Sequence, residues 1–164
     1  MSVVDVRVRR ARSDDVEFLA QVVFDVTRDQ GDDRLDANPD EFLLGLVEDA
    51  ADQIAGNVPD SSTYVIEAGG TRVGRLRLVH HQVAIEVAGL QIAVGAQGLG
   101  IGTIVLQRIQ SDARAAGQPV WLEVEDRNRG ADHLYRRLGF EPHGQARWAG
   151  YHRLRWNPQP EMTS

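Results

Sequence analysis

Several kinds of residue and segment are missing from this sequence of 164 residues. It contains no cysteine, which excludes a disulfide scaffold, a thiolate metal site and a cysteine nucleophile. No apolar run reaches the roughly 18 residues that a helix needs to span a bilayer. The first ten residues, MSVVDVRVRR, lack the charged-then-apolar order of a signal peptide. We therefore expect a cytoplasmic protein that has no contact with a membrane.

Lysine is absent too, because all 18 basic residues are arginine, against 24 acidic residues. Fourteen of these acids lie between Ser13 and Asp60, where the basic residues are Arg28 and Arg34. An acidic N-terminal half argues against a nucleic-acid partner and suits a cationic one. The alternative is that both halves carry ordinary solvated charge and imply no partner.

The spacing of apolar residues predicts one mixed α/β domain over residues 4–157 and a flexible tail over residues 158–164. Ser13 is expected to cap a first helix, and Asn38, followed by Pro39 and Glu41, a second one. Alternating residues then predict a hairpin that turns at Gly69 and Gly70. The remaining expected elements are a strand at 83–94, a helix at 101–116, a strand at 119–125, a helix at 128–138 and a strand at 147–156, in which Trp148, His152, Leu154 and Trp156 share one face.

Three glycines stand in the hexapeptide QGLGIG, residues 97–102, where the predicted strand gives way to a helix. The first N–H groups of a helix have no partner within it, and the helix dipole adds about half a positive charge there. Such a turn predicts an anion site. A P-loop is excluded because it requires a lysine, and the spacing differs from the G-x-G-x-x-G of dinucleotide-binding proteins. A purely structural glycine turn remains the alternative.

Two motifs resemble the GCN5-related N-acetyltransferase (GNAT) superfamily. The first is Gln97-x-x-Gly100-x-Gly102, and the second is Asn128-x-x-Ala131-x-x-Leu134-Tyr135-x-x-Leu138-Gly139-Phe140. About 30 residues separate them, filled by one helix and one strand, and the resemblance covers nearly the whole chain. Two positions depart from the family pattern: Gln97 stands where a basic residue is frequent, and Val94 where proline is common.

The resemblance implies a GNAT fold, with a mixed central sheet of six or seven strands flanked by four helices. It implies acetyl-CoA as cosubstrate and no metal. The residues that it assigns to cofactor binding are Ile92, Ala93, Val94, Gln97, Gly98, Leu99, Gly100, Ile101, Gly102, Thr103, Asn128 and Tyr135. The main chain of 92–94 would pair with the pantetheine arm as an added strand, and Asn128 would hydrogen-bond that arm, cap the following helix, or do both. Arg136 and Arg137 would be near the 3′-phosphate.

The reaction implied is acetyl transfer to a primary amine in a ternary complex. Glu86 is the candidate base, acting through water, because it lies in the apolar run VAIEVAGL, which would strengthen a carboxylate as a base. A solvent-facing strand glutamate is the alternative, and His80 and His81 are rival bases. Tyr135 is the candidate acid for the departing thiolate.

The acceptor implied is a small-molecule or peptide amine. The acidic residues Asp29, Asp32, Asp33 and Asp36 favour a cationic one, such as a polyamine or an aminoglycoside. Members of this family frequently dimerise, so a homodimer is also implied, and Trp148 and Trp156 fit either a dimer contact or a core. Two other functions stay open: a sensor or scaffold that binds acyl-CoA without turnover, and a nucleotide-phosphate binder.

Overall fold

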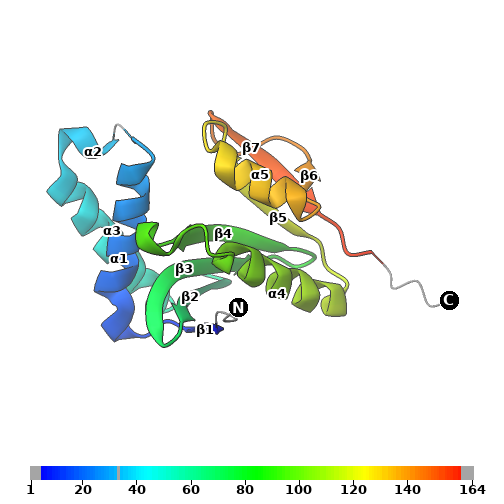
Figure 1. Ribbon diagram of the computed structural model, residues 1–164, viewed down its shortest axis with the longest axis horizontal. Helices are drawn as coiled ribbons and strands as arrows, with labels where there is room; N and C mark the ends of the chain where they lie inside the picture. The colour runs from blue at the N-terminus through cyan, green and yellow to red at the C-terminus, as the bar shows by residue number, and fades with distance from the viewer. Residues whose placement is uncertain (1–4, 33, 160–164) are drawn as a thin grey trace. The chain divides into compact units, whose positions relative to one another are not determined.

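The computed structural model describes residues 5–32 and 34–159 (Figure 1). The chain divides into two compact units. The first contains Met1–Leu78 and Gly89–Gly102, and the second contains Val79–Ala88 and Thr103–Ser164. Each unit is described by itself below. Among the described residues, no helix is long and apolar enough to cross a membrane.

The described residues form seven strands, four longer helices and one four-residue helix. The strands are β1 (Val6–Arg10), β2 (Ser61–Ala68), β3 (Thr71–His80), β4 (Ile85–Ile92), β5 (Val120–Glu125), β6 (Glu141–Pro142) and β7 (Tyr151–Trp156). The helices are α1 (Val16–Asp29), α2 (Arg34–Ala37), α3 (Pro39–Ile54), α4 (Ile101–Ala116) and α5 (Arg129–Arg137). This content confirms the predicted fold class.

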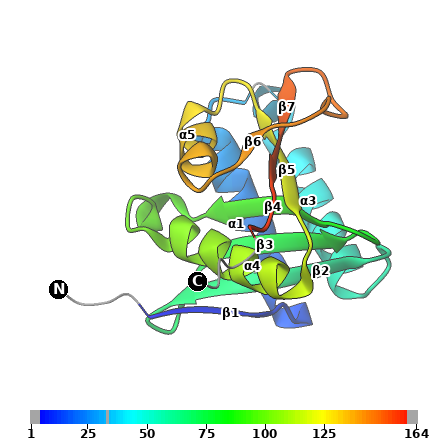
Figure 2. The ribbon, with the colours of Figure 1, turned by 90° about the vertical axis from the view of Figure 1, so that its right-hand side faces the viewer.

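The strands follow the order β1-β2-β3-β4-β5-β7-β6 in a mixed sheet. In the first unit, β1 pairs with β2 in antiparallel fashion, with Val6 opposite Ala68 (Figure 2). In the second unit, β4 and β5 are parallel, with Glu86 opposite Trp121, and β5 and β7 are antiparallel. Strand β4 is shared by the units, because residues 85–88 belong to the second and residues 89–92 to the first.

In the first unit, α1 and α3 lie side by side, and α3 also contacts β2 (Figure 1). Their shared core contains Leu19, Ala50 and Val65. Helix α3 starts as expected, because the Asn38 side-chain oxygen accepts a hydrogen bond from the Glu41 N–H at 3.1 Å. The hairpin turn is also confirmed: Gly69 and Gly70 both have positive φ angles, of 57° and 83°.

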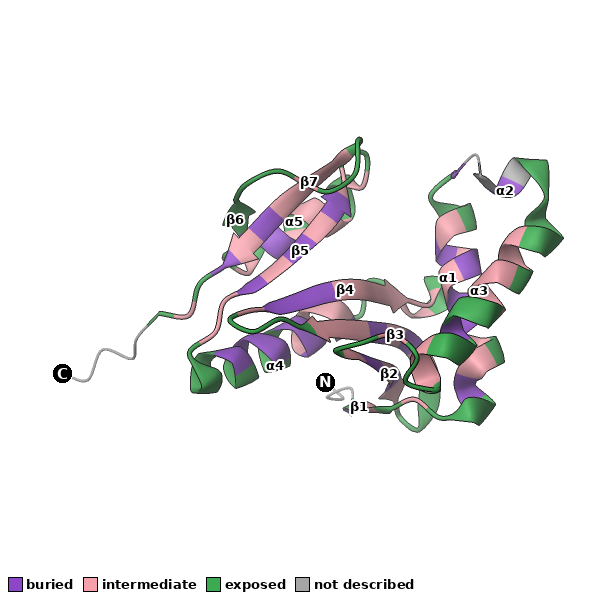
Figure 3. Ribbon diagram, turned by 180° about the vertical axis from the view of Figure 1, so that it is seen from behind, coloured by how far each residue is buried: buried purple, intermediate pink, exposed green. Residues whose placement is uncertain are grey.

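In the second unit, β5 alternates buried and half-buried residues (Figure 3). Its buried residues, Val120, Leu122 and Val124, form a core with Phe140 and Leu154. The half-buried face carries Trp121, Glu123 and Glu125. One face of the strand therefore belongs to the core, and the other carries one aromatic and two acidic side chains.

Two expectations about local structure are wrong. Ser13 does not cap the first helix; it begins a single 3₁₀ turn, Ser13–Asp15, that leads into α1. Asp15 stands at the N-cap position of α1 but makes no side-chain cap hydrogen bond to it; its carboxylate instead accepts the Arg12 N–H at 2.8 Å and so stabilises the start of the 3₁₀ turn. Trp148 does not share the buried face of the last strand, because β7 begins only at Tyr151, and Trp148 is 66% exposed.

Candidate active site

The glycine turn adopts the conformation that only glycine reaches without strain. Gly98 and Gly100 have φ angles of 79° and 82°, and α4 begins at the next residue, Ile101. A Cβ atom at either glycine would meet no atom within 4 Å, so backbone conformation, not crowding, requires glycine at both positions. The first N–H groups of α4 lack acceptors within the helix. The turn can therefore bind an anion with its main chain.

The segment that leads into this turn is strand-like over a shorter stretch than the sequence indicated. Strand β4 ends at Ile92, and Val94 begins a 3₁₀ turn. The Ala93 N–H already donates to the Val73 carbonyl oxygen at 2.7 Å, and the Gln97 side-chain amide donates to the Ile92 carbonyl oxygen at 3.0 Å. A ligand that pairs with the Ile92 carbonyl would replace the Gln97 amide there.

Thr103 and Arg137 come together near the start of α4. The Arg137 guanidinium donates to the Thr103 hydroxyl at 3.2 Å. Arg136, the other arginine predicted near a phosphate, donates instead to Asp132 on its own helix at 2.9 Å. Of the two, Arg137 therefore stands closer to the anion-binding start of α4 and carries a charge that is not committed to a helix carboxylate.

Asn128 and Tyr135 belong to α5 and its start. The Asn128 side-chain oxygen accepts the Ala131 N–H at 3.2 Å and so caps the helix, one of its two predicted roles. Tyr135 is buried with its ring 5.9 Å from that of Phe140. Burial raises the pKa of Tyr135 to about 12, so the phenol keeps its proton at neutral pH.

Glu86 is 3% exposed, so the alternative of a solvent-facing strand glutamate is wrong. Its carboxylate contacts the His81 ring nitrogen Nε2 at 3.0 Å and accepts a hydrogen bond from the Arg147 guanidinium. Two of the predicted candidates for the base are thus in direct contact. His80 is exposed at the end of β3, and no contact with Glu86 is found for it among the described residues.

Sequence reasoning missed the charged groups around Glu86. Glu123 accepts hydrogen bonds from Arg147 Nε at 3.1 Å and from Arg153 at 2.7 Å. These two guanidinium groups hold the pKa of Glu123 below its usual value, although burial acts in the opposite direction. Both also lie over the Trp121 ring, at 5.2 and 4.1 Å. The alternation in VWLEVE would have placed Trp121 and Glu123 on one face, but nothing in the sequence pointed to Arg147.

A pocket of about 210 Å³ opens at this cluster within the second unit. Its lining includes Glu86, Glu123, Arg147, Trp148 and Tyr151. The pocket combines two buried carboxylates with aromatic side chains, a combination that binds cations.

The acidic residues predicted to attract a cationic acceptor are only partly described. Asp29 is exposed at the end of α1, whereas Asp32 is 7% exposed. Asp33 and the side chain of Asp36 lie outside the described residues. Asp32 is therefore not the surface charge that its sequence context suggested.

The sequence profile of the Acetyltransferase (GNAT) family matches residues 23–140, which is more than half of the chain. The chain belongs to this family. A streptothricin acetyltransferase of Streptomyces lavendulae is 32% identical to this GNAT chain over 96 residues, which are 56% of the chain and 51% of that protein. The match thus spans about half the length of that relative.

Two solved structures have the same fold. The PaiA N-acetyltransferase from Thermoplasma acidophilum, in complex with coenzyme A, gives a TM-score of 0.74 at 16% identity and covers 93% of this chain and 99% of its own. A chimera of the spermidine N-acetyltransferase SpeG from Vibrio cholerae and hSSAT gives a TM-score of 0.67 at 18% identity, over 93% and 95% of the two chains. These likenesses confirm the GNAT fold.

Proposed function

We propose that this protein transfers the acetyl group of acetyl-CoA to a primary amine, in a complex that holds both substrates. The observation that carries the proposal is the turn at Gly98 and Gly100, which leads straight into the N-terminus of α4. Its main-chain N–H groups would bind the diphosphate of the cofactor. The coenzyme A bound by the PaiA N-acetyltransferase supports this choice of ligand.

The amine has to lose a proton to become a nucleophile, because an alkylammonium group titrates near pKa 10. We assign the acceptance of this first proton to Glu86, through water, with His81 as the neighbour that fixes the carboxylate at 3.0 Å. The neutral nitrogen then attacks the thioester carbonyl carbon, the C–S bond breaks, and a second proton leaves the nitrogen as the thiolate departs. Glu86 also lines the pocket beside Glu123 and Trp148, which brings its carboxylate within reach of a bound amine.

We assign the stabilisation of the departing thiolate to Tyr135. With a pKa of about 12, its phenol is fully protonated at neutral pH and can donate a hydrogen bond to the sulfur. A thiol titrates near pKa 8.5, so complete transfer of the phenolic proton would cost about 5 kcal/mol. Tyr135 would therefore act chiefly as a hydrogen-bond donor, and the thiolate would take its proton from solvent or from the amine.

The test is an assay of free thiol release from acetyl-CoA with spermidine and streptothricin as amines, the acceptors named for two relatives. Tyr135→Phe should lower kcat about 10²-fold without changing the affinity for acetyl-CoA. Glu86→Gln should lower kcat to a similar degree. Tyr64→Phe, on β2, is the matched control and should leave kcat unchanged.

Calorimetric titration with acetyl-CoA, ATP and NAD distinguishes an acetyltransferase from the two other functions that the sequence left open. Binding of acetyl-CoA without turnover of any amine would indicate a sensor or scaffold. Preference for ATP or NAD would indicate a nucleotide-phosphate binder and overturn the proposal.

A further inference from the structure

The pocket beside Glu86 already contains a cation that belongs to the chain itself. Arg147 donates from its guanidinium to Glu86 and, through Nε, to Glu123 at 3.1 Å. Its main-chain N–H also faces the two Glu123 oxygens, at 3.2 and 3.3 Å. One arginine thus satisfies both buried carboxylates of the pocket.

Arg147 stands on a loop, and its side chain reaches the pocket from the solvent side. Residues 143–150 contain no helix or strand, and the Arg147 side chain is 50% exposed although both of its carboxylate partners are buried. Gly144 and Gly150 bracket the arginine with φ angles of 69° and 82°, and a Cβ atom at either would meet nothing within 4 Å. Segments with few packed contacts open at low free-energy cost.

If Arg147 left the pocket, Glu86 and Glu123 would each keep one other partner. Arg153, on β7, would keep its 2.7 Å hydrogen bond to Glu123, and His81 would keep its contact with Glu86. Two carboxylates against one remaining guanidinium leave an excess of one negative charge. Trp121, freed of one of its two stacked guanidinium groups, would offer its ring face. The vacated pocket would therefore attract one new cation.

We propose that Arg147 occupies the acceptor's cation subsite, and that a cationic acceptor displaces it to bind Glu86 and Glu123. This inference rests on the proposed acetyltransferase function. It names the acceptor class as an aliphatic polyamine, whose protonated amino group replaces the guanidinium. An acceptor without a cation leaves Arg147 in place and Glu86 engaged.

The test measures binding of spermidine to the full chain without cofactor, by calorimetry. Spermidine can bind only while Arg147 is out of the pocket, so the apparent association constant of spermidine is the intrinsic one multiplied by the fraction of time that the pocket is vacant. Occupancy of about 90% predicts that Arg147→Gln tightens spermidine binding about 10-fold. Arg147→Lys, which keeps a cation, should bind spermidine about as weakly as the unaltered protein. The double variant Arg147→Gln with Glu123→Gln should lose the gain.

Arg155→Gln is the matched control, because Arg155 lies on β7 with Asn157 and His143 as its partners and should not affect spermidine. Equal or weaker spermidine binding by a folded Arg147→Gln protein would overturn the inference. A gain that persists in the double variant would do so as well. Acetyl-CoA binding, measured separately on the same proteins, tests the proposed function and does not depend on this outcome.

Discussion

Two carboxyl groups, Asp15 in the first unit and Glu86 in the second, are buried to nearly the same degree but are held differently. They are 1% and 3% exposed. Asp15 accepts two hydrogen bonds from Arg9, at 2.8 and 3.0 Å, and faces Arg72 at 3.3 Å. Both arginines stand on strands of the sheet. Glu86 depends on His81 and Arg147, which stand outside strands and helices.

Burial alone therefore does not separate a carboxylate that supports the fold from one that is available for the role we propose for Glu86. Asp15 also accepts the N–H of Arg12 and so ties the chain before α1 to two strands of the sheet. Glu86 can lose Arg147 to solvent while the strands around it stay paired. We therefore expect changes at Asp15 to act on stability and changes at Glu86 to act on turnover.

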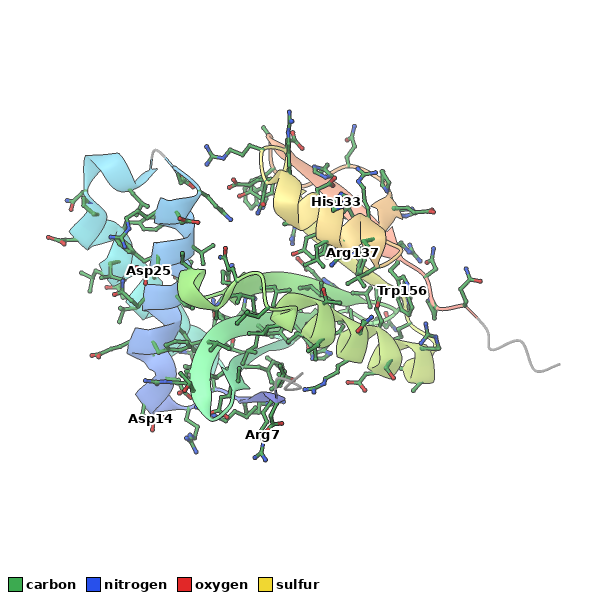
Figure 4. All side chains as sticks on the ribbon, viewed as in Figure 1. Arg7, Asp14, Asp25, His133, Arg137 and Trp156 are labelled. Carbon is green, nitrogen blue, oxygen red and sulfur yellow. The ribbon has the colours of Figure 1, made fainter. Side chains whose placement is uncertain are left out.

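The largest effect on stability is expected from Asp15→Asn. Removing the charge weakens the hydrogen bonds from Arg9, Arg72 and the Arg12 N–H; because Arg9 keeps Glu67 at 3.4 Å and both guanidinium groups are partly exposed, we expect a loss of about 1.5–3 kcal/mol. Urea unfolding followed by circular dichroism measures the loss. Asp14→Asn is the control, because Asp14 is its exposed neighbour (labelled in Figure 4) and should change stability by less than about 1 kcal/mol. Equal losses in the two variants would contradict the structural role of Asp15.

The ion pair between Asp15 and Arg9 also makes the free energy of unfolding depend on pH, in a direction that can be stated. Hydrogen bonds from Arg9, and further donors, hold the pKa of Asp15 well below its usual value of 3.8. The stabilisation is therefore present above about pH 4 and is lost as the pH falls through the lower folded value. Acid should narrow the stability difference between the unaltered protein and Asp15→Asn.

A smaller loss is expected where a cation is buried without a carboxylate in hydrogen-bonding contact. Among the described residues, Arg75 donates to the side-chain oxygens of Gln91 and Gln53, at 2.9 and 3.1 Å, and burial lowers its pKa to about 10. A Cβ atom at Gly89 would stand 2.3 Å from Arg75 Nη1. Gly89→Ala should therefore cost about 1–3 kcal/mol, the usual range for overpacking.

The loss caused by Gly89→Ala is measured by its thermal midpoint of unfolding, and Gly45→Ala on α3 is the control. Gly45 meets no atom within 4 Å of an added Cβ, so alanine there should be neutral or stabilising. Adding Arg75→Gln to Gly89→Ala should restore part of the loss. A Gly89→Ala protein as stable as the unaltered one would mean that Arg75 moves aside freely.

Several of these features could be predicted from the sequence and others could not. The turn at Gly98 and Gly100, the Asn128 cap and the family were readable because each depends on neighbours in the chain. The contact between Glu86 and Arg147 joins residues 61 positions apart, so no local pattern contains it. Ser13 was misassigned as a cap because the chain first makes a 3₁₀ turn, Ser13–Asp15, and α1 begins only at Val16.

Glu86→Gln should alter stability by no more than about 1 kcal/mol, because Arg147 keeps Glu123 as a partner and its side chain is half exposed. This small change should accompany the large loss of turnover predicted above. Urea unfolding and thiol release measured on one preparation check the two effects together. A loss of several kcal/mol would place Glu86 in the same structural class as Asp15.

The smallest effect is expected at a third carboxylate cluster, where a histidine supplies the positive charge. His152 lies between Asp126 and Asp132, with ring nitrogens 2.7 and 2.6 Å from their oxygens. Although burial acts against it, these carboxylates raise the pKa of His152. The stabilisation is thus fully present below about pH 6.5 and is lost as the pH rises through the folded value.

His152→Asn should therefore cost under about 1 kcal/mol at pH 6, since the ring is partly exposed, and almost nothing at pH 9. Unfolding free energies measured at both pH values check this. His133→Asn, at an exposed position on α5 (labelled in Figure 4), should show no such dependence. Asp126 and Asp132 are both more exposed than Asp15, so we expect the loss in His152→Asn to be the smaller one. A pH-dependent loss as large as that of Asp15→Asn would contradict the view that Asp15 stabilises the fold because its partners stand on strands.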